Sequence, residues 1–417
     1  MSAINAKASR KMKKYAVLTR EPRCFLGSLA FSWEQRKLNE VVNVYDGVHQ
    51  TPDYKESGVM FLSVENISTL KSEKYISEEA FQRDYKVYPQ KGDILMTRIG
   101  DVGTPNVVET TEKVAFYVSL ALLKPTKINS YFLCNSIQSP LFQKGLKDRT
   151  LVTAIPQKIN KDEIGKVNII LPTSSQEQQL IGEYFANLDR LITLHQRKFE
   201  KLTNVKKSML EKMFPQNGSS YPEIRFKGFT DPWEQREVGD LLIERSQQAP
   251  MSDEYPLMAF IANEGVAPKG ERYDRSALVT DTVNKLYKKT EKGDFIYSSN
   301  NLETGSIGLN KYGKACISPV YSIFEPTGIA DSDFLGRRLV RKDFINAMVK
   351  WRQGVIYGQW RIHESDFLKI EISVPSVEEQ RKIGAYLDQL DNLITLHQRE
   401  LEKLQNIKKS MLEKMFV

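Results

Sequence analysis

The sequence predicts an α+β protein in which two mixed α/β blocks and two long helices form an internal repeat. Residues 181–214 align without gaps with residues 383–416 and are identical at 25 of 34 positions. Upstream, Trp-Glu-Gln-Arg occurs at residues 33–36 and again at 233–236. Between these anchors the two halves diverge and keep only landmarks such as Lys-Gly-Asp at 91–93 and 292–294. Such self-similarity indicates a duplicated architecture.

The near-identical segments are predicted to be helices. Apolar and aromatic side chains recur in steps of three and four, a spacing typical of a coiled-coil seam: Ile181, Phe185, Leu188, Ile192, His195, Phe199 and Leu202. The run Pro172 to Ser175, followed by Gln176 and Glu177, is typical of a helix start, and Pro215 to Ser220 of a stop and linker. The second copy opens at Pro375-Ser376.

Each helix would have about 35 residues and a length near 50 Å. A narrow apolar seam of that length must be buried, and the second copy offers the same seam. The sequence allows parallel or antiparallel pairing, and antiparallel pairing would relate the two blocks by a pseudo-two-fold axis. The alternative, in which each helix packs only on its own block, leaves much of so long a seam exposed.

The two divergent blocks are predicted to be mixed α/β. Runs rich in β-branched and aromatic residues, bounded by turn residues, predict strands at 58–64, 93–97, 167–171, 294–297 and 369–374.

Composition favours a nucleic-acid partner and a cytoplasmic protein. The formal net charge is +8, which favours a polyanionic partner. No apolar run is long enough to span a membrane, and three widely separated cysteines indicate reduced thiols. The basic segment 1–32 is expected to be a disordered tail, or else a phosphate-binding arm, and not a signal peptide.

The duplication has a direct meaning for DNA. Duplex DNA has local two-fold symmetry, so a duplicated protein can place one reading block on each of two half-sites. Because the blocks differ, the half-sites should differ. The helices would then set a separation of roughly one to one and a half turns of DNA, at about 34–36 Å a turn.

Further short motifs accompany the repeat: Trp-Glu-Gln-Arg at each block, Asp46 to Pro52, Lys-Gly-Asp with Thr97 to Gly100, Ile-x-x-Pro leading into Glu-Gln, and Pro222 to Thr230. In this order, and with the anchors present twice, the chain resembles the DNA-specificity subunits of type I restriction-modification systems from Trp33 to the end. The stretch from Pro22 to Phe31 departs from the pattern expected before Trp33, so the resemblance assigns no role to residues 1–32.

The resemblance implies a non-catalytic, sequence-specific DNA-binding subunit. It implies a basic tail (1–32), a first target-recognition domain (33–174), a central helix (175–214), a linker (215–232), a second target-recognition domain (233–376) and a C-terminal helix (377–417), with the helices in an antiparallel coiled coil. It also implies two adenine-methyltransferase subunits and restriction subunits as partners. S-adenosylmethionine, ATP and magnesium would belong to those partners, and no cofactor to this chain.

DNA contacts are expected in polar loops, since Arg and Lys suit guanine and phosphate, and Asn and Gln suit adenine. The candidates in the first block are His49, Gln50, Thr51, Thr97, Arg98, Lys147, Arg149 and Thr150. Those in the second are Ser298, Ser299, Asn300, Asn301, Arg352, Gln353, Tyr357, Gln359 and Arg361. For each, ordinary solvated surface or a turn cap is the competing interpretation.

No catalytic or metal motif is recognisable. The phosphate loop, the dinucleotide fingerprint and the Asn-Pro-Pro-Tyr motif are absent from the sequence. His195 and His397 are interpreted as seam packing in preference to a metal pair, and Trp351 and Trp360 as core in preference to base stacking. A coiled-coil assembly scaffold that binds no DNA, and an enzyme with an unrecognised site, remain as alternatives.

Overall fold

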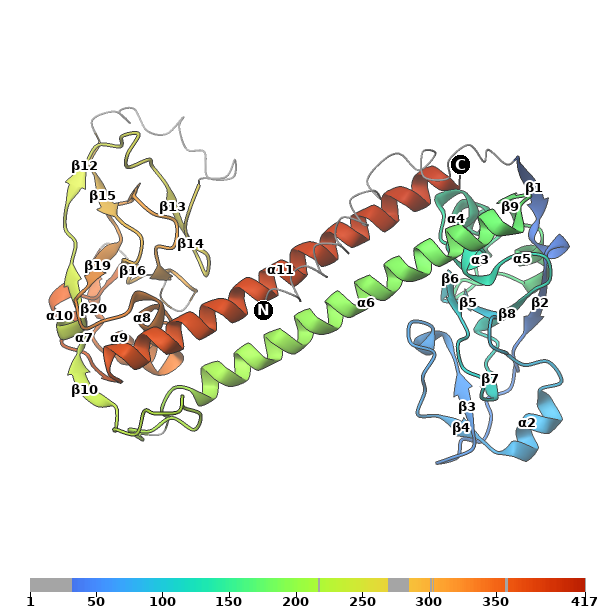
Figure 1. The fold of residues 1–417 in the computed structure, drawn as a ribbon, viewed down its shortest axis with the longest axis horizontal. Helices are drawn as coiled ribbons and strands as arrows, with labels where there is room; N and C mark the ends of the chain where they lie inside the picture. Colours follow the sequence, from blue (N-terminus) through green and yellow to red (C-terminus); the bar gives the residue numbers. More distant parts are fainter. Residues whose placement is uncertain are drawn as a thin grey trace. The chain divides into compact units, whose positions relative to one another are not determined.

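The computed structural model describes residues 32–216, 218–268, 285–300, 302, 304–356 and 359–416, without the side chains of 353–356, 359 and 360. It divides into two compact units (Figure 1). Unit 1 comprises Met1–Arg197 with Gln398–Val417, and unit 2 comprises Lys198–His397. The basic segment 1–32 lies outside the described residues apart from Ser32.

Unit 1 is built around a four-stranded antiparallel sheet in the order β2-β8-β5-β6. Its strands are β2 (Val42–Asp46), β8 (Leu120–Pro125), β5 (Ile94–Ile99) and β6 (Asp101–Val107). A three-stranded sheet holds β4 (Tyr75–Ile76), β3 (Val59–Leu62) and β7 (Val114–Phe116), with β3 and β7 parallel. Two-residue periodicity lets Leu95 and Leu122 pack toward the small sheet, while Ile94 and Leu123 join the opposite core.

The second core of unit 1 is covered by short helices and closed by a two-stranded pair. The pair joins β1 (Trp33–Lys37) to β9 (Asn168–Pro172). The helices are α3 (Ser130–Ile137), α4 (Pro140–Lys147) and α5 (Lys161–Gly165). A further helix, α2 (Glu78–Asp84), packs through Phe81 on the core beside the small sheet, and 3-10 turns lie at Leu38–Glu40 and Val64–Asn66. The Trp-Glu-Gln-Arg motif is thus a strand that ties the beginning of the block to its end.

Unit 2 repeats this plan with a four-stranded sheet in the order β11-β19-β16-β17. Its strands are β11 (Leu242–Glu244), β19 (Ser322–Pro326), β16 (Phe295–Tyr297) and β17 (Ile307–Leu309). The remaining strands are β12 (Gln248–Ala249), β15 (Tyr287–Thr290) and β18 (Ala315–Ile317), the pair β13 (Ala259–Ile261) and β14 (Gly265–Ala267), the hairpin β20 (Gln353–Ile356) and β21 (Gln359–Arg361), and the closing pair β10 (Glu234–Glu237) and β22 (Glu371–Val374).

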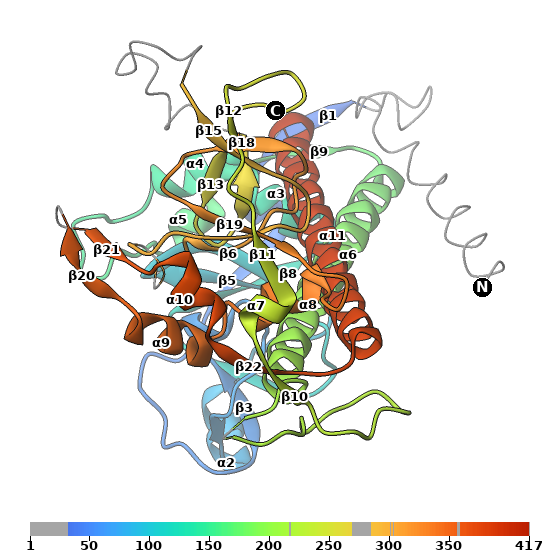
Figure 2. The ribbon, with the colours of Figure 1, turned by 90° about the vertical axis from the view of Figure 1, so that its left-hand side faces the viewer.

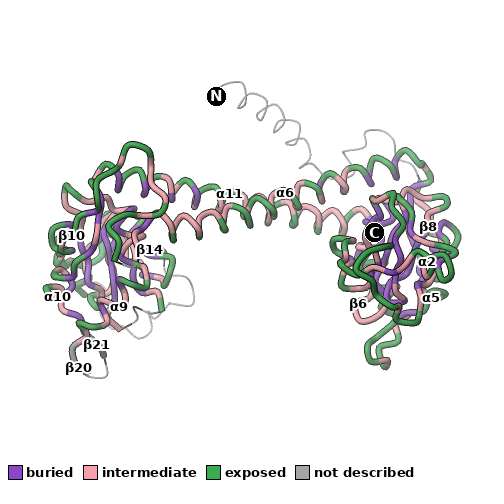
Figure 3. Tube along the Cα trace, turned by 90° about the horizontal axis from the view of Figure 1, so that it is seen from below, coloured by how far each residue is buried: buried purple, intermediate pink, exposed green. Residues whose placement is uncertain are grey.

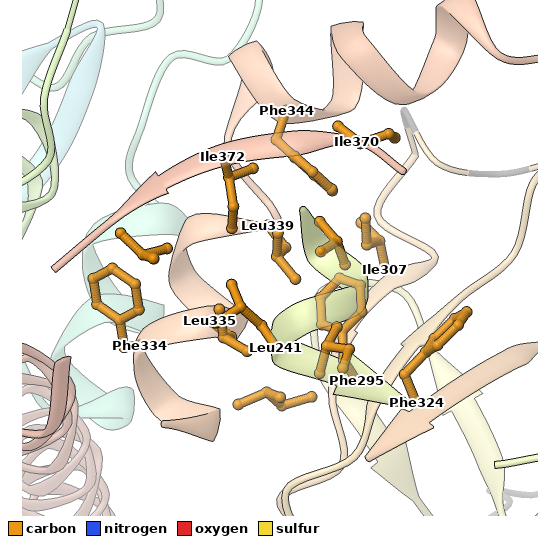
Figure 4. Close-up of a cluster of buried hydrophobic side chains, with 14 of the residues drawn as sticks. Leu241, Phe295, Ile307, Phe324, Phe334, Leu335, Leu339, Phe344, Ile370 and Ile372 are labelled. Atoms are coloured by element: carbon orange, nitrogen blue, oxygen red, sulfur yellow. The ribbon is translucent and has the colours of Figure 1, made fainter. Parts of the chain in front are cut away.

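The helices of unit 2 are α7 (Val238–Leu241), α8 (Ser332–Arg338), α9 (Lys342–Lys350) and α10 (Glu364–Leu368). Aromatic and aliphatic side chains from these helices and from the large sheet fill one core, in which Phe295, Phe324 and Phe344 are fully buried (Figure 4). The prediction of mixed α/β blocks is therefore confirmed for both units.

The two long helices form where the repeat predicted them. α6 spans Ser175–Lys212 and α11 spans Val377–Met415. Ser174 Oγ accepts the backbone N–H of Glu177 at 3.3 Å, and Ser376 Oγ accepts that of Glu379 at 3.5 Å, so the Ser-x-x-Glu pattern caps each helix start. The first turns are buried on one face and exposed on the other, and the middle of each helix is half-buried or exposed (Figure 3).

Each unit contains the first part of one long helix and the last part of the other. In unit 1, the ring of Phe416 lies 5.4 Å from that of Phe132, 6.0 Å from Phe185 and 6.2 Å from Trp33. In unit 2, the ring of Phe214 lies 5.5 Å from Phe334 and 6.0 Å from Trp233. Phe416 and Phe214 are the same position of the repeat, so both copies of the Lys-Met-Phe ending close an aromatic core.

Candidate DNA interface

The loops of unit 1 that hold the predicted contacts leave one edge of the four-stranded sheet. β2 and β5 are both antiparallel to β8, so they run in the same direction and end at the same edge. β8 and β6 begin there. The residues after β2, the Ile99–Asp101 turn and the loop of residues 149–158 all lie at this edge, which we call the unit 1 edge.

Three of the predicted contacts, His49, Gln50 and Thr51, are exposed at the unit 1 edge, as side chains that contact DNA must be. The chain beneath them is held by backbone bonds from Val48 N–H to Phe116 O at 3.3 Å and from Val118 N–H to Val48 O at 3.0 Å. Three exposed polar side chains on an anchored turn can donate to and accept from base edges or phosphates.

Thr97 and Arg98, in contrast, lie in the interior, contrary to the prediction that they contact DNA. Thr97 is completely buried, and its Oγ1 donates to Asp101 at 3.0 Å and accepts from Thr104 N–H at 2.9 Å. Arg98 pairs with Asp46 and donates from Nε to Ile159 O at 3.1 Å. Burial lowers the pKa of Arg98 from its usual value. Thr97 thus joins β5 to β6 and Arg98 joins β5 to the end of β2, so both residues position the edge beneath the loops.

The basic stretch after α4 is partly used by the helix itself. Lys147 is exposed. Arg149 donates from Nη1 to Gly145 O at 3.2 Å, and Thr150 Oγ1 donates to Leu146 O at 2.8 Å. Arg149 and Thr150 thereby satisfy carbonyls of the last helical turn, while Lys147 presents its charge to solvent.

Unit 2 has the corresponding edge. β11 and β16 are both antiparallel to β19 and end together, so the residues after Tyr297 leave the sheet at this edge. The structure brings two of the predicted segments together there: Arg352 donates from Nη2 to Ser299 O at 3.3 Å, and Ser299 Oγ accepts Ile362 N–H at 3.1 Å. The β20–β21 hairpin lies beside α9 and α10 (Figure 2).

The remaining candidates of unit 2 divide by exposure. Arg361 is exposed and Asn300 is half-buried. Ser298 is buried, and its backbone N–H donates to Ser306 O at 2.8 Å, contrary to the prediction of a DNA contact. Gln353 and Gln359 belong to the β20–β21 hairpin, opposite Arg361 and Ile356 respectively, but their side chains are not described. Asn301 and Tyr357 lie outside the described residues.

Sequence reasoning missed an apolar stretch at the unit 1 edge. Leu151, Val152 and Ile155 are exposed between the basic residues Arg149 and Lys158. Apolar residues normally indicate core, so the sequence offered no reason to place them outside. The nearest signal was the following Pro156, which interrupts strand and helix alike.

Several residues away from the two edges also bear on the sequence-based predictions. The repeat mates Lys408 and Lys206 form ion pairs, with Asp189 at 2.7 Å in unit 1 and with Asp391 at 2.5 Å in unit 2. Among the described residues no cluster of His, Cys, Asp and Glu could hold a metal, and no helix is long and apolar enough to cross a membrane. Cys134 and Cys316 are free and buried. Trp351 is 40% exposed, which contradicts its expected place in the core.

Comparison with known proteins gives a consistent picture. The family model for the type I restriction modification DNA specificity domain matches twice, at residues 32–204 and 230–406. A Methanocaldococcus jannaschii protein described as "Putative type I restriction enzyme MjaX specificity subunit" is 26% identical over 93% of each chain. The "Type I restriction enzyme MjaVIII specificity subunit" of the same organism is 26% identical over 64% of this chain and 65% of its own.

The fold is shared with a solved structure. The crystal structure of a type I restriction-modification system S subunit from M. genitalium superposes with a TM-score of 0.60 at 14% identity, over 94% of this chain and 98% of the other. The two family-model matches together cover most of the sequence, and each contains one sheet edge with its loops. The chain belongs to the type I restriction-modification DNA-specificity family.

Proposed function

We propose that this chain is the non-catalytic DNA-reading subunit of a type I restriction-modification complex, in which each unit reads one half of a split DNA target. The observation that supports the proposal is that both units share the same arrangement of strands and helix starts, while the loops at their sheet edges differ. The Trp-Glu-Gln-Arg strand, the closing pair and the helix start recur in both units, while the loops at the two edges differ in sequence. Different loops on a shared framework are suited to reading different half-sites.

We further propose that α6 and α11 pair as an antiparallel coiled coil with pseudo-two-fold symmetry and thereby set the distance between half-sites. The support comes from contacts inside each unit. Asp189 of α6 meets Lys408 of α11 in unit 1, and Asp391 of α11 meets Lys206 of α6 in unit 2. A later position on α6 thus meets an earlier position on α11, as antiparallel neighbours do, and the two pairs are mates in the repeat.

The partners follow from this role. Two adenine-methyltransferase subunits would dock on the chain, and restriction subunits would complete the assembly. S-adenosylmethionine would then be bound by the methyltransferase, and ATP and magnesium by the restriction subunits, in the cytoplasm. The sequence of this chain carries none of the motifs expected for binding these cofactors, which supports their assignment to the partners.

The test is a map of adenine methylation in genomic DNA from cells with and without this gene, each expressing the partner methyltransferase. We expect a split motif with two unequal halves and a fixed gap, whose methylation disappears on deletion and returns when the gene is restored. Unchanged methylation in the presence of an active methyltransferase would overturn the proposal and favour the assembly scaffold. Methyl transfer or ATP hydrolysis by the isolated chain would contradict a non-catalytic role.

A further inference from the structure

The loop of residues 151–158 in unit 1 presents apolar side chains directly to solvent. Ile155 is 100% exposed, Val152 66% and Leu151 45%. We call these three residues the apolar tip. Single exposed apolar residues are ordinary, whereas several within five positions at the end of one loop form a patch of the kind that marks a binding site.

The apolar tip is held in place by the sheet edge. Leu151 N–H donates to Lys158 O at 2.8 Å and Lys158 N–H to Leu151 O at 3.4 Å, which closes the loop. Gly100 N–H donates to Gln157 O at 2.8 Å, and Gln157 Nε2 donates to Gly100 O at 3.0 Å. These bonds fasten the loop to the β5–β6 turn. An anchored loop that keeps apolar side chains in water is preorganised for a partner that covers them.

The charges around the apolar tip identify the partner. The segment 147–158 contains three basic residues, Lys147, Arg149 and Lys158, and one acidic residue, Asp148. The loop also leaves the same edge as His49, Gln50 and Thr51. Apolar side chains with cationic and amide neighbours suit a polyanion whose interior is apolar, which describes duplex DNA, with phosphates outside and thymine methyls and base faces within the grooves.

We propose that Ile155, supported by Val152 and Leu151, enters a groove of the half-site read by unit 1 and contacts the apolar surface of a base. This inference rests on the proposed function and adds a specificity determinant that is neither charged nor hydrogen-bonding. The apolar surface is either a thymine methyl or the face of a base at an opened step. In both cases the tip distinguishes sequences, while Lys147 and Lys158 attract the backbone.

The experiment begins with the full chain in complex with its methyltransferase and with the split motif found by methylation mapping. The variants are Ile155→Ala and the triple change Leu151→Ala, Val152→Ala and Ile155→Ala. The matched control is Leu141→Ala, because Leu141 is 47% exposed but lies at the beginning of α4. Binding is measured for a duplex carrying the motif and for one with both halves shuffled, over a series of salt concentrations.

We expect the triple variant to lose roughly tenfold or more in affinity for the motif duplex, the order of one lost base contact. Affinity for the shuffled duplex, and the slope of log affinity against log salt, should stay unchanged because no phosphate contact is removed. Methylation mapping should show relaxed positions in one half of the motif only. The Leu141→Ala variant should bind and methylate like the wild type.

A second arm replaces thymine by deoxyuridine in that half-site, which removes only the methyl. If the tip contacts a methyl, wild-type affinity falls and the triple variant is indifferent to the replacement. If the tip contacts a base face, both proteins ignore the replacement while the triple variant still binds the motif less tightly. Both results support an apolar base contact.

Three outcomes would overturn the inference. The triple variant could bind and methylate like the wild type. It could lose affinity equally for both duplexes. It could fail to retain the methyltransferase during purification, which would assign the tip to a protein partner. Failure of the proposed function is distinct, since the wild-type complex would then direct methylation to no split motif at all.

Discussion

At Gly182, helix α6 runs against the beginning of α3 with no room for a side chain. A Cβ placed there would lie 2.6 Å from Asn129 Oδ1 and 2.9 Å from Phe132 N. Asn129 Oδ1 caps α3 by accepting Phe132 N–H at 3.0 Å. The repeat mate Gly384 meets Asp331 and Phe334 in the same way, so this glycine is required by close packing.

Gly182→Ala is therefore expected to destabilise unit 1 by about 1–3 kcal/mol, since either the helix shifts or the cap of α3 is broken. Urea unfolding measures the change. Thr193→Ala is the control: Thr193 is exposed on the same helix, where alanine should be neutral or slightly stabilising. Equal stability of Gly182→Ala and the control would show that α6 tolerates a methyl group at this contact.

The structural role of Arg98 can also be tested, because the structure places this predicted DNA contact in the interior. Arg98→Met leaves Asp46 without its buried partner and removes the bond to Ile159 O, and should destabilise unit 1 by about 3 kcal/mol. The exposed pair of Arg83 with Asp84 serves as control, and Arg83→Met should leave the stability nearly unchanged because solvent screens an exposed ion pair. If Arg98→Met leaves the unfolding curve unchanged and only weakens DNA binding, the sequence-based interpretation was right after all.

Among the elements, those with a clear period or a repeated motif were predictable and the loops were not. Strands were predicted at 58–64, 93–97, 167–171, 294–297 and 369–374, and each range overlaps an observed strand. Both long helices begin within a few residues of their capping signals, and α6 ends shortly before Pro215. Thr97 and Ser298 failed as surface candidates because a polar residue beside a turn is satisfied equally well by internal bonds. Ile155 was missed because no sequence pattern distinguishes an exposed apolar residue from a buried one.

Phe416, the residue directly after α11, is expected to be essential to unit 1. The change Phe416→Ala leaves a cavity between Trp33, Phe132 and Phe185 and should lower the free energy of unfolding by about 3–5 kcal/mol. Phe214→Ala is the matched variant for unit 2, beside Trp233. Thermal unfolding with hydrogen exchange should show each variant weakening the amides of its own unit. Protection lost in the opposite unit alone would contradict the assignment of each helix end.

The beginning of α11 carries a pH-sensitive ionic network in unit 2. Arg337 Nη2 donates to Asp388 at 2.7 Å and to Asp391 at 2.8 Å, and Lys311 Nζ lies 2.7 Å from Asp388. Burial by itself raises the pKa of Asp388, but the bonds from Lys311 and Arg337 outweigh it and lower the pKa to about 2.

A carboxylate whose pKa is lower in the folded state stabilises the protein when it is ionised. The contribution of Asp388 is thus fully present above about pH 4, its ordinary pKa range, and is lost as the pH falls toward 2. Free energies of unfolding measured between pH 2 and pH 6 should fall in acid more steeply for the wild type than for Asp388→Asn. If the two proteins gave parallel curves of unfolding free energy against pH, Asp388 would not be a source of the acid sensitivity.

At the scale of the whole molecule, the proposed function predicts that the two halves of the target respond independently. His49→Ala with Gln50→Ala should relax methylation at positions of one half-site, and Arg361→Ala at positions of the other, because these residues belong to separate units. Each good base contact contributes about 1–3 kcal/mol of discrimination. Methylation maps of the two variants provide the measurement. Changes by both variants in the same half would refute the assignment of one half to each unit.

The placement of Phe416 also governs how the chain can fold during its own synthesis. Unit 2 is a continuous stretch of sequence, whereas unit 1 needs residues 398–417 to complete its core. At about 5–20 residues per second, translation reaches those residues roughly 10 to 40 s after residue 197 has been made. During that interval the aromatic face around Trp33 stays uncovered, and the core of unit 1 closes only after the segment that holds Phe416 has been made.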